Sequence, residues 1–202
     1  AALADAEGEA GVIPAAAVMP IITCCMAIDA DMAALAAAAG IAGNTAIPLV
    51  RMATAEVAES DPEAAKWVHY GATSQDVLDT GLVLQLREAF KVVEADLARA
   101  MAAAAALARA HRDTPMAGRT WLQQALPITF GLKMAGTLDA LLRHAERIGE
   151  ARPRLLALQF GGAAGTLASL GGRGPDVARL LAERLGLALP DTPWHGQRDR
   201  VF

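Results

Sequence analysis

The stretch HYGATSQDVLDT, residues 69–80, separates two different patterns in the chain. Short helical segments with frequent breaks come before it, and one long uninterrupted helical pattern comes after it. Gly71 permits a turn in which the backbone approaches a neighbouring group closely. Thr73 and Ser74 follow at the start of the predicted helix, and Asp76 stands three residues after Thr73, close to the spacing of a capping box. The stretch therefore predicts a helix N-terminus.

This predicted helix start has two interpretations. Its free N–H groups and the positive end of the helix dipole, with the hydroxyls of Thr73 and Ser74 and the imidazole of His69, are suited to bind a carboxylate. Alternatively, the hydroxyls only cap the helix and His69 is an ordinary surface histidine. The spacing of the residues leaves both interpretations open.

The composition favours an all-α protein. Of the 202 residues, 54% are hydrophobic but only 4% are aromatic, and the abundance of alanine favours helix over sheet. The formal net charge of -4, without a basic run, argues against nucleic acid as a partner. Cys24 and Cys25 are adjacent and the only cysteines, which argues against a disulfide and favours a reducing cytoplasm.

Two uncharged runs, residues 10–28 and 32–50, approach the length needed to span a bilayer. Prolines interrupt the first run, and glycines, an asparagine and a proline interrupt the second. We therefore interpret both as buried helices of a soluble protein and expect no membrane association. The first ten residues are acidic and do not resemble a signal peptide.

The periodicity of apolar residues predicts a series of helices. Short helices are expected over residues 1–10, 20–27, 31–39 and 49–59, with a break over 40–48 and another helix start at 60–63. Longer helices are expected over 74–111 and from Pro127 to about Ala151, and a short amphipathic helix over 176–185, closed by Gly186. The glycine-rich segment 159–174 and the segment from Pro190 to Phe202 are expected to form loops.

The long helix over residues 74–111 is the clearest of these. Its apolar side chains recur at steps of three, four or seven from Leu82 to Ala108, and its length at 1.5 Å per residue is about 50 Å. Residues 100–110 are apolar on nearly every side, and such a helix is normally covered by other helices. Because one chain of 202 residues cannot readily surround it, we expect an oligomeric helical bundle.

Several residues could suggest metal or nucleotide binding. The segment GGAAGT, residues 161–166, lacks the spacing of a dinucleotide or phosphate loop, so we interpret it as a tight turn or a place of close packing. No pair of histidines or carboxylates has a metal-ligand spacing, and we expect no metal. His111 and His144 lie near basic residues on predicted helices and are interpreted as solvated.

A second candidate carboxylate site lies near residue 119. Arg119 offers a fixed cation in a segment that reads as buried, and Thr120 and Gln124 add hydrogen-bonding groups, which together can hold a small carboxylate. The alternative is a structural arginine that ties loop carbonyls together. Chemistry alone leaves both open.

Four segments occur in a fixed order along the chain: GNTAIPLV (43–50), HYGATSQDVLDT (69–80), GRTWLQQALP (118–127) and QFGGAAGTLA (159–168). Together they resemble the fumarase/aspartase superfamily and, within it, the family of bacterial 3-carboxy-cis,cis-muconate cycloisomerases. The resemblance implies an all-α fold, with an N-terminal helical domain over residues 1–73 and the first part of a central bundle of long helices over 74–202. It also implies a homotetramer in which three subunits build each active site.

The implied reaction needs no cofactor and acts on a small anionic substrate, a tricarboxylate muconate. One substrate carboxylate adds across a double bond, and the carbon next to another carboxylate takes up a proton. The resemblance assigns substrate-binding positions to Asn44, Thr73, Ser74, Arg119, Thr120 and Gln124. It assigns catalytic positions to His69, Ser74 and Trp121.

The chain departs from its relatives at two histidine positions. Adenylosuccinate lyase carries a histidine where this chain has Trp121, and another relative's catalytic histidine falls at Asn44. The acid/base pair of the purine lyases is therefore absent, and Trp121 offers instead an apolar wall with one N–H donor. This argues against adenylosuccinate lyase.

The serine-rich loop that carries the usual catalytic base of the superfamily is not among these residues, and we expect it beyond Phe202. We therefore expect the chain to be an N-terminal half that is inactive by itself. Two alternatives remain open. One is another superfamily lyase that eliminates a group β to a carboxylate, and the other is a non-catalytic helical oligomer that kept the fold.

Overall fold

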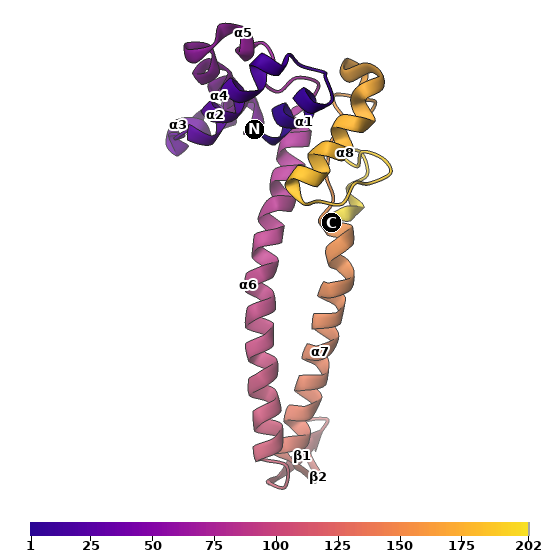
Figure 1. The fold of residues 1–202 in the computed structure, drawn as a ribbon. Coiled ribbons are helices and arrows are strands. Elements are labelled where there is room, and N and C mark those ends of the chain that lie inside the picture. The colour runs from indigo at the N-terminus through magenta and orange to yellow at the C-terminus, as the bar shows by residue number, and fades with distance from the viewer. Residues whose placement is uncertain (202) are drawn as a thin grey trace. The chain divides into compact units, whose positions relative to one another are not determined.

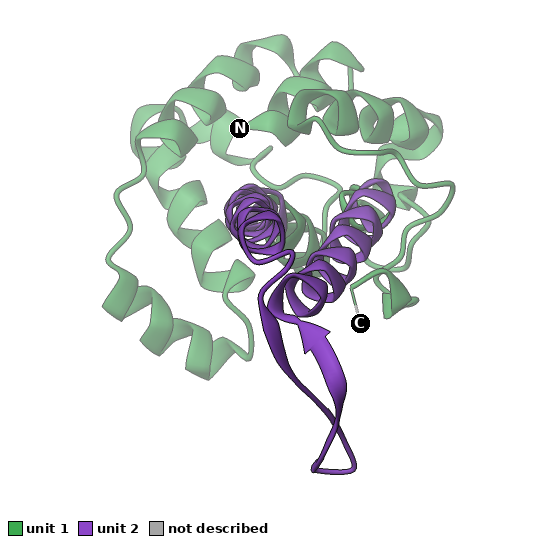
Figure 2. Ribbon diagram, turned by 90° about the horizontal axis from the view of Figure 1, so that it is seen from below, with its two compact units in different colours: residues 1–84, 154–202 green, residues 85–153 purple. Residues whose placement is uncertain are grey.

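The structure, a computed structural model, describes residues 1–201 and divides into two compact units. Unit 1 comprises residues 1–84 and 154–202, and unit 2 comprises residues 85–153 (Figure 2). One helix begins in unit 1 and continues into unit 2. The domain boundary expected after residue 73 stays a prediction.

Two predictions from the sequence concern the end of the chain and cannot be compared with the structure. Phe202, the last residue of the loop expected from Pro190 onward, lies outside the described residues. The main catalytic base is expected on a loop beyond Phe202, so the structure of residues 1–201 does not test it. The position of this base stays a prediction.

Most of the chain is helical, as predicted (Figure 1). Unit 1 contains helices α1 (Ala2–Glu9), α2 (Ala15–Ala27), α3 (Met32–Ala42), α4 (Ala46–Ser60), α5 (Pro62–Ala65), α8 (Gly174–Leu185), the 3-10 helices η1 (Ala168–Arg173) and η2 (Arg198–Arg200), and the start of α6 (Ser74–Ala110). Unit 2 contains the rest of α6, strands β1 (Pro115–Thr120) and β2 (Gln123–Thr129), and most of α7 (Phe130–Leu155).

Local signals set several helix boundaries where the sequence predicts them. Helix α6 begins at Ser74, and Asp61 caps α5 by accepting hydrogen bonds from the first backbone N–H groups of that helix. Gly186 ends α8 in the left-handed region, with φ of 62°. Asp61 supplies hydrogen bonds that the start of a helix requires, and Gly186 adopts a conformation that ends one.

The prediction that Pro127 opens the second long helix is wrong. Residues 115–129 form an antiparallel hairpin of β1 and β2, and α7 begins only at Phe130. Pro127 lies in β2, where a two-stranded sheet tolerates a residue without an N–H donor. Helix α7 also continues past the expected end near Ala151 and includes Pro153. A proline in the last turn is tolerated there, because it removes only a single backbone hydrogen bond of the helix.

Two other helices start earlier than predicted. Helix α2 begins at Ala15 and contains Pro20, and helix α4 begins at Ala46 and contains Pro48. Pro48 lies in the first turn, where its missing N–H would have had no partner inside the helix. The break predicted over residues 40–48 is therefore narrower, and it centres on Gly43, whose φ is 79°.

Helix α3 corrects the expectation that both uncharged runs are buried. None of its described residues is buried, and Ile41 is 91% exposed. Among the described residues, no single helix is long and apolar enough to cross a membrane, and α2 and α3 meet the criterion only as a pair bent by 111°.

Two apolar clusters hold unit 1 together. One surrounds α8 and includes Leu158, Phe160 and Trp194, and the other joins α1, α2 and α4 through residues such as Ile21 and Val57. In unit 2, α7 runs back alongside α6 (Figure 1). An ion pair joins these helices, because Arg152 donates to Glu94 at 2.9 Å.

Candidate active site

The start of α6 is built around the carboxylate of Asp76, which is only 4% exposed. The Thr73 N–H donates to Oδ2 of Asp76 at 3.0 Å, which is the backbone half of the predicted capping box. The N–H groups of Gly161 and Gly162 and the side-chain amide of Gln159 donate to the same carboxylate at 2.8–3.0 Å. The helix dipole at this end therefore already stabilises an anion of the chain itself.

The hydroxyls of Thr73 and Ser74 remain available for a ligand. Both side chains are partly buried, and neither hydroxyl makes a hydrogen bond within residues 1–201. These hydroxyls therefore do not cap the helix in the structure. The side chain that caps it is that of Asp76. Their role in binding a substrate carboxylate stays a prediction.

The glycine-rich segment after α7 packs against this helix start. A Cβ at Gly162 would lie 3.0 Å from the carbonyl oxygen of Gly71, and a Cβ at Gly161 would lie 2.7 Å from Cβ of Pro193. Gly162 also has a positive φ of 67°. The interpretation of this segment as a tight turn and a place of close packing is therefore confirmed.

His69 lies beside an apolar cavity of about 340 Å³ in unit 1. The cavity is lined mainly by aliphatic side chains and by Cys25, and neither Thr73 nor Ser74 belongs to its wall. Burial lowers the pKa of the His69 imidazole, and the negative charge of Asp76 opposes this only in part. His69 is therefore held in its neutral form near neutral pH, the form in which an imidazole can accept a proton. Its φ of 61° is in the left-handed region, which is strained for a histidine.

The segment 118–127 forms a hairpin whose turn is Trp121-Leu122. Both turn residues have positive φ, 48° and 62°, and their side chains are 95% and 100% exposed. A two-residue turn of this kind normally contains asparagine and glycine, so each larger residue costs about 1–2 kcal/mol. Strain and an exposed apolar pair at one turn are features that occur at functional surfaces.

Arg119 lies next to this turn and corrects one expectation. The Gly-Arg-Thr segment reads as buried, but Arg119 and Thr120 are exposed. The guanidinium of Arg119 makes no hydrogen bond within residues 1–201, so it does not tie loop carbonyls together either. Arg119 stands opposite Gln124 in the hairpin register, and the two form a cross-strand pair of cation and amide.

The structure places the candidate residues in two sets. Asn44, His69, Thr73 and Ser74 lie in unit 1, and Arg119, Thr120, Trp121 and Gln124 lie in unit 2. Within the first set, Oδ1 of Asn44 accepts the Ile47 N–H at 3.0 Å at the start of α4. The oxygen of Asn44 is thus engaged, while its amide nitrogen makes no hydrogen bond within residues 1–201.

The loop after α8 contributes polar residues that were not predicted from the sequence to belong to the site. Arg198 donates to both oxygens of the buried Asp79, at 2.8 and 2.9 Å, and the Trp194 N–H donates to Gln159 at 2.6 Å. His195 accepts from the same Gln159. The run PWHGQRDR, residues 193–200, was the signal available, since it concentrates an aromatic residue, an imidazole and two guanidinium groups in one loop.

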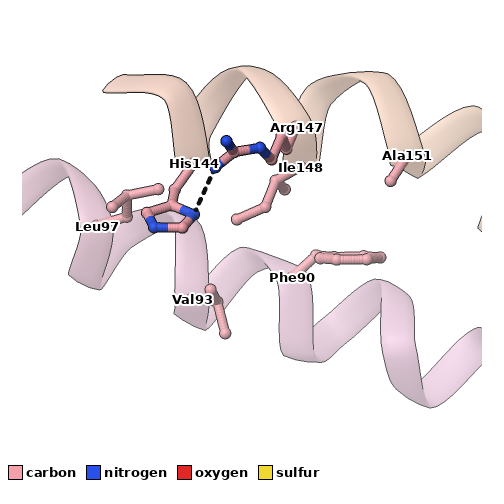
Figure 3. Close-up of a pocket in the computed structure, with 7 residues that line it drawn as sticks. All are labelled: Phe90, Val93, Leu97, His144, Arg147, Ile148 and Ala151. Atoms are coloured by element: carbon pink, nitrogen blue, oxygen red, sulfur yellow. Dashed lines mark hydrogen bonds between the residues drawn. The ribbon is translucent and has the colours of Figure 1, made fainter. Parts of the chain in front are cut away.

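A separate apolar groove of about 470 Å³ lies between α6 and α7 in unit 2 (Figure 3). Phe90, Val93 and Leu97 line it from α6, and Ile148 and Ala151 line it from α7. Its polar groups are His144 and Arg147, which are joined by a hydrogen bond of 3.2 Å at its edge. The ring of His144 is exposed, in keeping with its interpretation as solvated. The apolar lining suits a hydrophobic contact better than a tricarboxylate.

Comparisons with known proteins identify the family. Residues 1–202 match the family model described as "Lyase". The chain belongs to this lyase family. It is 58% identical over 201 residues to the 3-carboxy-cis,cis-muconate cycloisomerase of Pseudomonas aeruginosa, a match that covers 100% of this chain and 44% of the relative. It is 41% identical over 199 residues to the N-acetyl-S-(2-succino)cysteine lyase of Dickeya dadantii, covering 98% of this chain and 43% of that protein.

Solved structures agree with this assignment. The 3-carboxy-cis,cis-muconate lactonizing enzyme from Pseudomonas putida superposes with a TM-score of 0.95 at 55% identity, covering 98% of this chain and 45% of that one. The resemblance read from the four sequence segments and the all-α fold it implies are therefore confirmed. The chain spans about half the length of the curated relatives it matches.

Proposed function

We propose that the protein formed with this chain interconverts 3-carboxy-cis,cis-muconate and its lactone, 4-carboxymuconolactone. The observation that carries the proposal is the 58% identity to the Pseudomonas aeruginosa cycloisomerase over 201 residues. The residue chemistry supports it, because a substrate with three carboxylates needs several donors. The free hydroxyls of Thr73 and Ser74 and the unpaired guanidinium of Arg119 are groups of this kind within residues 1–201.

In the lactonising direction, an oxygen of one carboxylate forms a bond to a carbon of the double bond. The electron pair of that double bond moves onto the neighbouring carbon, next to a second carboxylate, and this carbon then takes up a proton. Negative charge therefore develops on the second carboxylate in the transition state. We assign Arg119, Thr120 and Gln124 to stabilise carboxylate charge, because fixed donors aimed at developing charge lower the barrier most effectively.

The other candidates take supporting roles in the same reaction. Thr73 and Ser74 bind a further carboxylate, with Asn44 as an additional donor through its free amide nitrogen. Neutral His69 can exchange a proton near the site, and Trp121 supplies an apolar wall that selects substrate shape. The reaction requires no metal or cofactor.

We also propose that copies of the chain assemble into a homotetramer. Val92, Val93, Leu132 and Leu142 of α6 and α7 are 46–64% exposed, and exposed apolar side chains on long helices favour association. The exposed pair Trp121-Leu122 adds to this surface. Sites built from several subunits would then combine the two sets of candidate residues. A cytoplasmic location, without nucleic acid or membrane partners, belongs to the same proposal.

A lyase activity is the second candidate function, because the chain is also 41% identical to an N-acetyl-S-(2-succino)cysteine lyase. That enzyme name implies removal of a group β to a carboxylate of a succino compound. The carboxylate-binding residues would serve both reactions. The two activities are therefore distinguished by which of the two substrates the protein turns over.

The test uses a chimaera in which these 202 residues replace the matching part of the Pseudomonas aeruginosa relative. Loss of the absorbance of 3-carboxy-cis,cis-muconate, with lactone formed in equal amount, is the expected result. Turnover of N-acetyl-S-(2-succino)cysteine instead would support the lyase. A folded oligomer that turns over neither substrate would support a non-catalytic role and reject the proposal.

A further inference from the structure

Gln159 is the residue that joins the loop after α8 to the start of α6, and it is only 1% exposed. Its backbone N–H donates to the Thr80 hydroxyl at 3.0 Å, and that hydroxyl donates to the Gln159 carbonyl at 2.8 Å. The side-chain oxygen of Gln159 accepts the backbone N–H of Trp194 at 2.6 Å. Because a backbone N–H can only donate, this contact determines which side-chain atom of Gln159 is the oxygen and which the nitrogen.

The amide nitrogen of Gln159 has two hydrogens and two acceptors. One acceptor is Oδ1 of Asp76 at 2.8 Å, and the other is Nδ1 of His195 at 2.9 Å. Asp76 receives three further N–H donors, so its carboxylate fixes the amide firmly in place. Since Gln159 offers a hydrogen to Nδ1 of His195, that nitrogen carries no proton. The neutral ring therefore carries its proton on Nε2.

The opposite edge of the His195 ring is open. Nε2 makes no hydrogen bond within residues 1–201, and the side chain is half-buried. Gly165 lies beside this edge, and a Cβ at that position would lie 3.5 Å from Cε1 of the ring. A glycine there leaves space next to the Nε2–H group.

We propose that His195 binds a substrate carboxylate through Nε2–H and that Gln159 is the positioning residue that holds the ring in this tautomer. The proposal rests on the proposed function, and it adds a donor from outside the four segments that carry the family resemblance. A continuous series of hydrogen bonds leads from the Thr73 N–H through Asp76 and Gln159 to His195. His195 is thus fixed to the same helix start that presents the free hydroxyls of Thr73 and Ser74. A neutral donor held in one orientation needs no reorganisation when the anion binds or gains charge.

The tautomer can be measured on the 202-residue chain itself. With 15N-labelled histidine at about pH 8, where an ordinary imidazole is neutral, long-range proton–nitrogen correlation spectra distinguish the two ring nitrogens. His195, assigned by the loss of its signals in His195→Gln, should show a protonated Nε2 and an unprotonated Nδ1. A proton on Nδ1 would overturn the proposal whatever the activity of the enzyme.

The binding role is tested in the chimaera. His195→Phe should lower kcat/KM about ten- to hundredfold, because a hydrogen bond to a charged group is lost. His195→Gln, whose side-chain nitrogen can take the place of Nε2, should restore most of that loss. Gln197→Ala, an exposed residue of the same loop, is the matched control and should leave kcat/KM unchanged.

The outcomes separate this proposal from the proposed function. If the wild-type chimaera fails to lactonise its substrate, the proposed function fails, and calorimetric binding of tricarballylate, a stable tricarboxylate, then compares wild type with His195→Phe without turnover. Weaker binding by His195→Phe supports the proposal. Equal kcat/KM, or equal affinity for tricarballylate, in His195→Phe and wild type would overturn it.

Discussion

Arg198 forms a two-pronged ion pair with Asp79, in which two guanidinium nitrogens donate to the two carboxylate oxygens at 2.8 and 2.9 Å. Asp79 is 2% exposed and lies in the second turn of α6, whereas Arg198 lies 119 residues later in the chain. Hydrogen bonding to Asp79 is the main cause that raises the pKa of the Arg198 guanidinium. The pair therefore fastens the loop after α8 to the helix that begins the candidate site.

Arg198→Met should lower the free energy of unfolding by about 3 kcal/mol, because it leaves a buried carboxylate without its cation. Arg179→Met is the matched control, since the pair of Arg179 with Glu183 is exposed and should contribute less than about 1 kcal/mol. Urea denaturation measures both. The double variant Asp79→Leu/Arg198→Met should be more stable than Arg198→Met alone, and the opposite order would contradict this account.

Glu7 gives the stability of the chain a defined pH dependence. The side chain is fully buried, neither carboxyl oxygen has a hydrogen-bond partner in the described structure, and burial raises its pKa from 4.5 to about 8. Between these two values the folded state binds more protons than the unfolded state, so stability falls as pH rises, by up to about 1.4 kcal/mol per unit. Below pH 4.5 both states are protonated and this dependence disappears.

Glu7→Gln removes the charge and should flatten the stability profile between pH 4.5 and 8. The variant should be more stable than wild type at the upper end of this range. Thermal unfolding at a series of pH values provides the measurement, with the exposed Glu59→Gln as control. If the Glu7→Gln profile keeps the same slope as the wild-type profile between pH 4.5 and 8, the raised pKa of Glu7 is contradicted.

Thr73 and Ser74 should affect catalysis more than stability. Their hydroxyls make no hydrogen bond within residues 1–201, while the cap of α6 comes from Asp76. Replacing both with alanine in the chimaera should therefore lower kcat/KM at least about a hundredfold, or roughly 3 kcal/mol, with little change in melting temperature. A lower melting temperature with normal kinetics per folded molecule would restore the interpretation as helix caps.

The sequence predicted those parts of the fold that depend on neighbours along the chain. Asp61, Gly186 and the spacing of Thr73 and Asp76 act within one helical turn, so their effects can be recognised in a short window. The hairpin was missed because its turn, Trp121-Leu122, lacks the asparagine and glycine by which such turns are recognised.

In the candidate site, too, local features were predicted from the sequence and contacts between distant residues were not. The four segments predicted the family, and they predicted which residues could bind carboxylates. The contacts of Gln159 with His195 and of Arg198 with Asp79 connect residues 36 and 119 positions apart. Such contacts follow from the packing of loops against α6, and no local pattern reveals them. Burial of Arg119 was predicted wrongly because small and apolar neighbours in sequence do not place a hairpin inside a core.

Assembly can be tested at an exposed position of α6. Val92 is 64% exposed in the chain, so Val92→Glu should leave the fold intact yet disrupt association, because a charge buried without a partner in an interface costs several kcal/mol. Ala104 is a poorer choice, since it is only 6% exposed and a charge there would also disturb the chain's own packing. Sedimentation should show a smaller species for Val92→Glu and an unchanged one for Val92→Ala. Equal sedimentation of Val92→Glu and wild type would contradict this interface.

The last prediction concerns the 202 residues by themselves, with the main catalytic base expected beyond Phe202. Their carboxylate-binding candidates can position a substrate, but proton transfer needs an acid or base matched to the reaction, and its loss lowers the rate roughly a hundred- to ten-thousandfold. The resemblance places Trp121 where adenylosuccinate lyase carries a histidine, and His195, whose Nδ1 accepts a hydrogen bond from Gln159, presents a donor and not a base. We therefore expect no measurable lactonisation of 3-carboxy-cis,cis-muconate by this chain alone, whereas the chimaera recovers it. Clear turnover by the purified chain would place the catalytic base within these residues. His69, whose pKa is lowered by burial, would then be the first to replace, and loss of that turnover in His69→Gln would identify it.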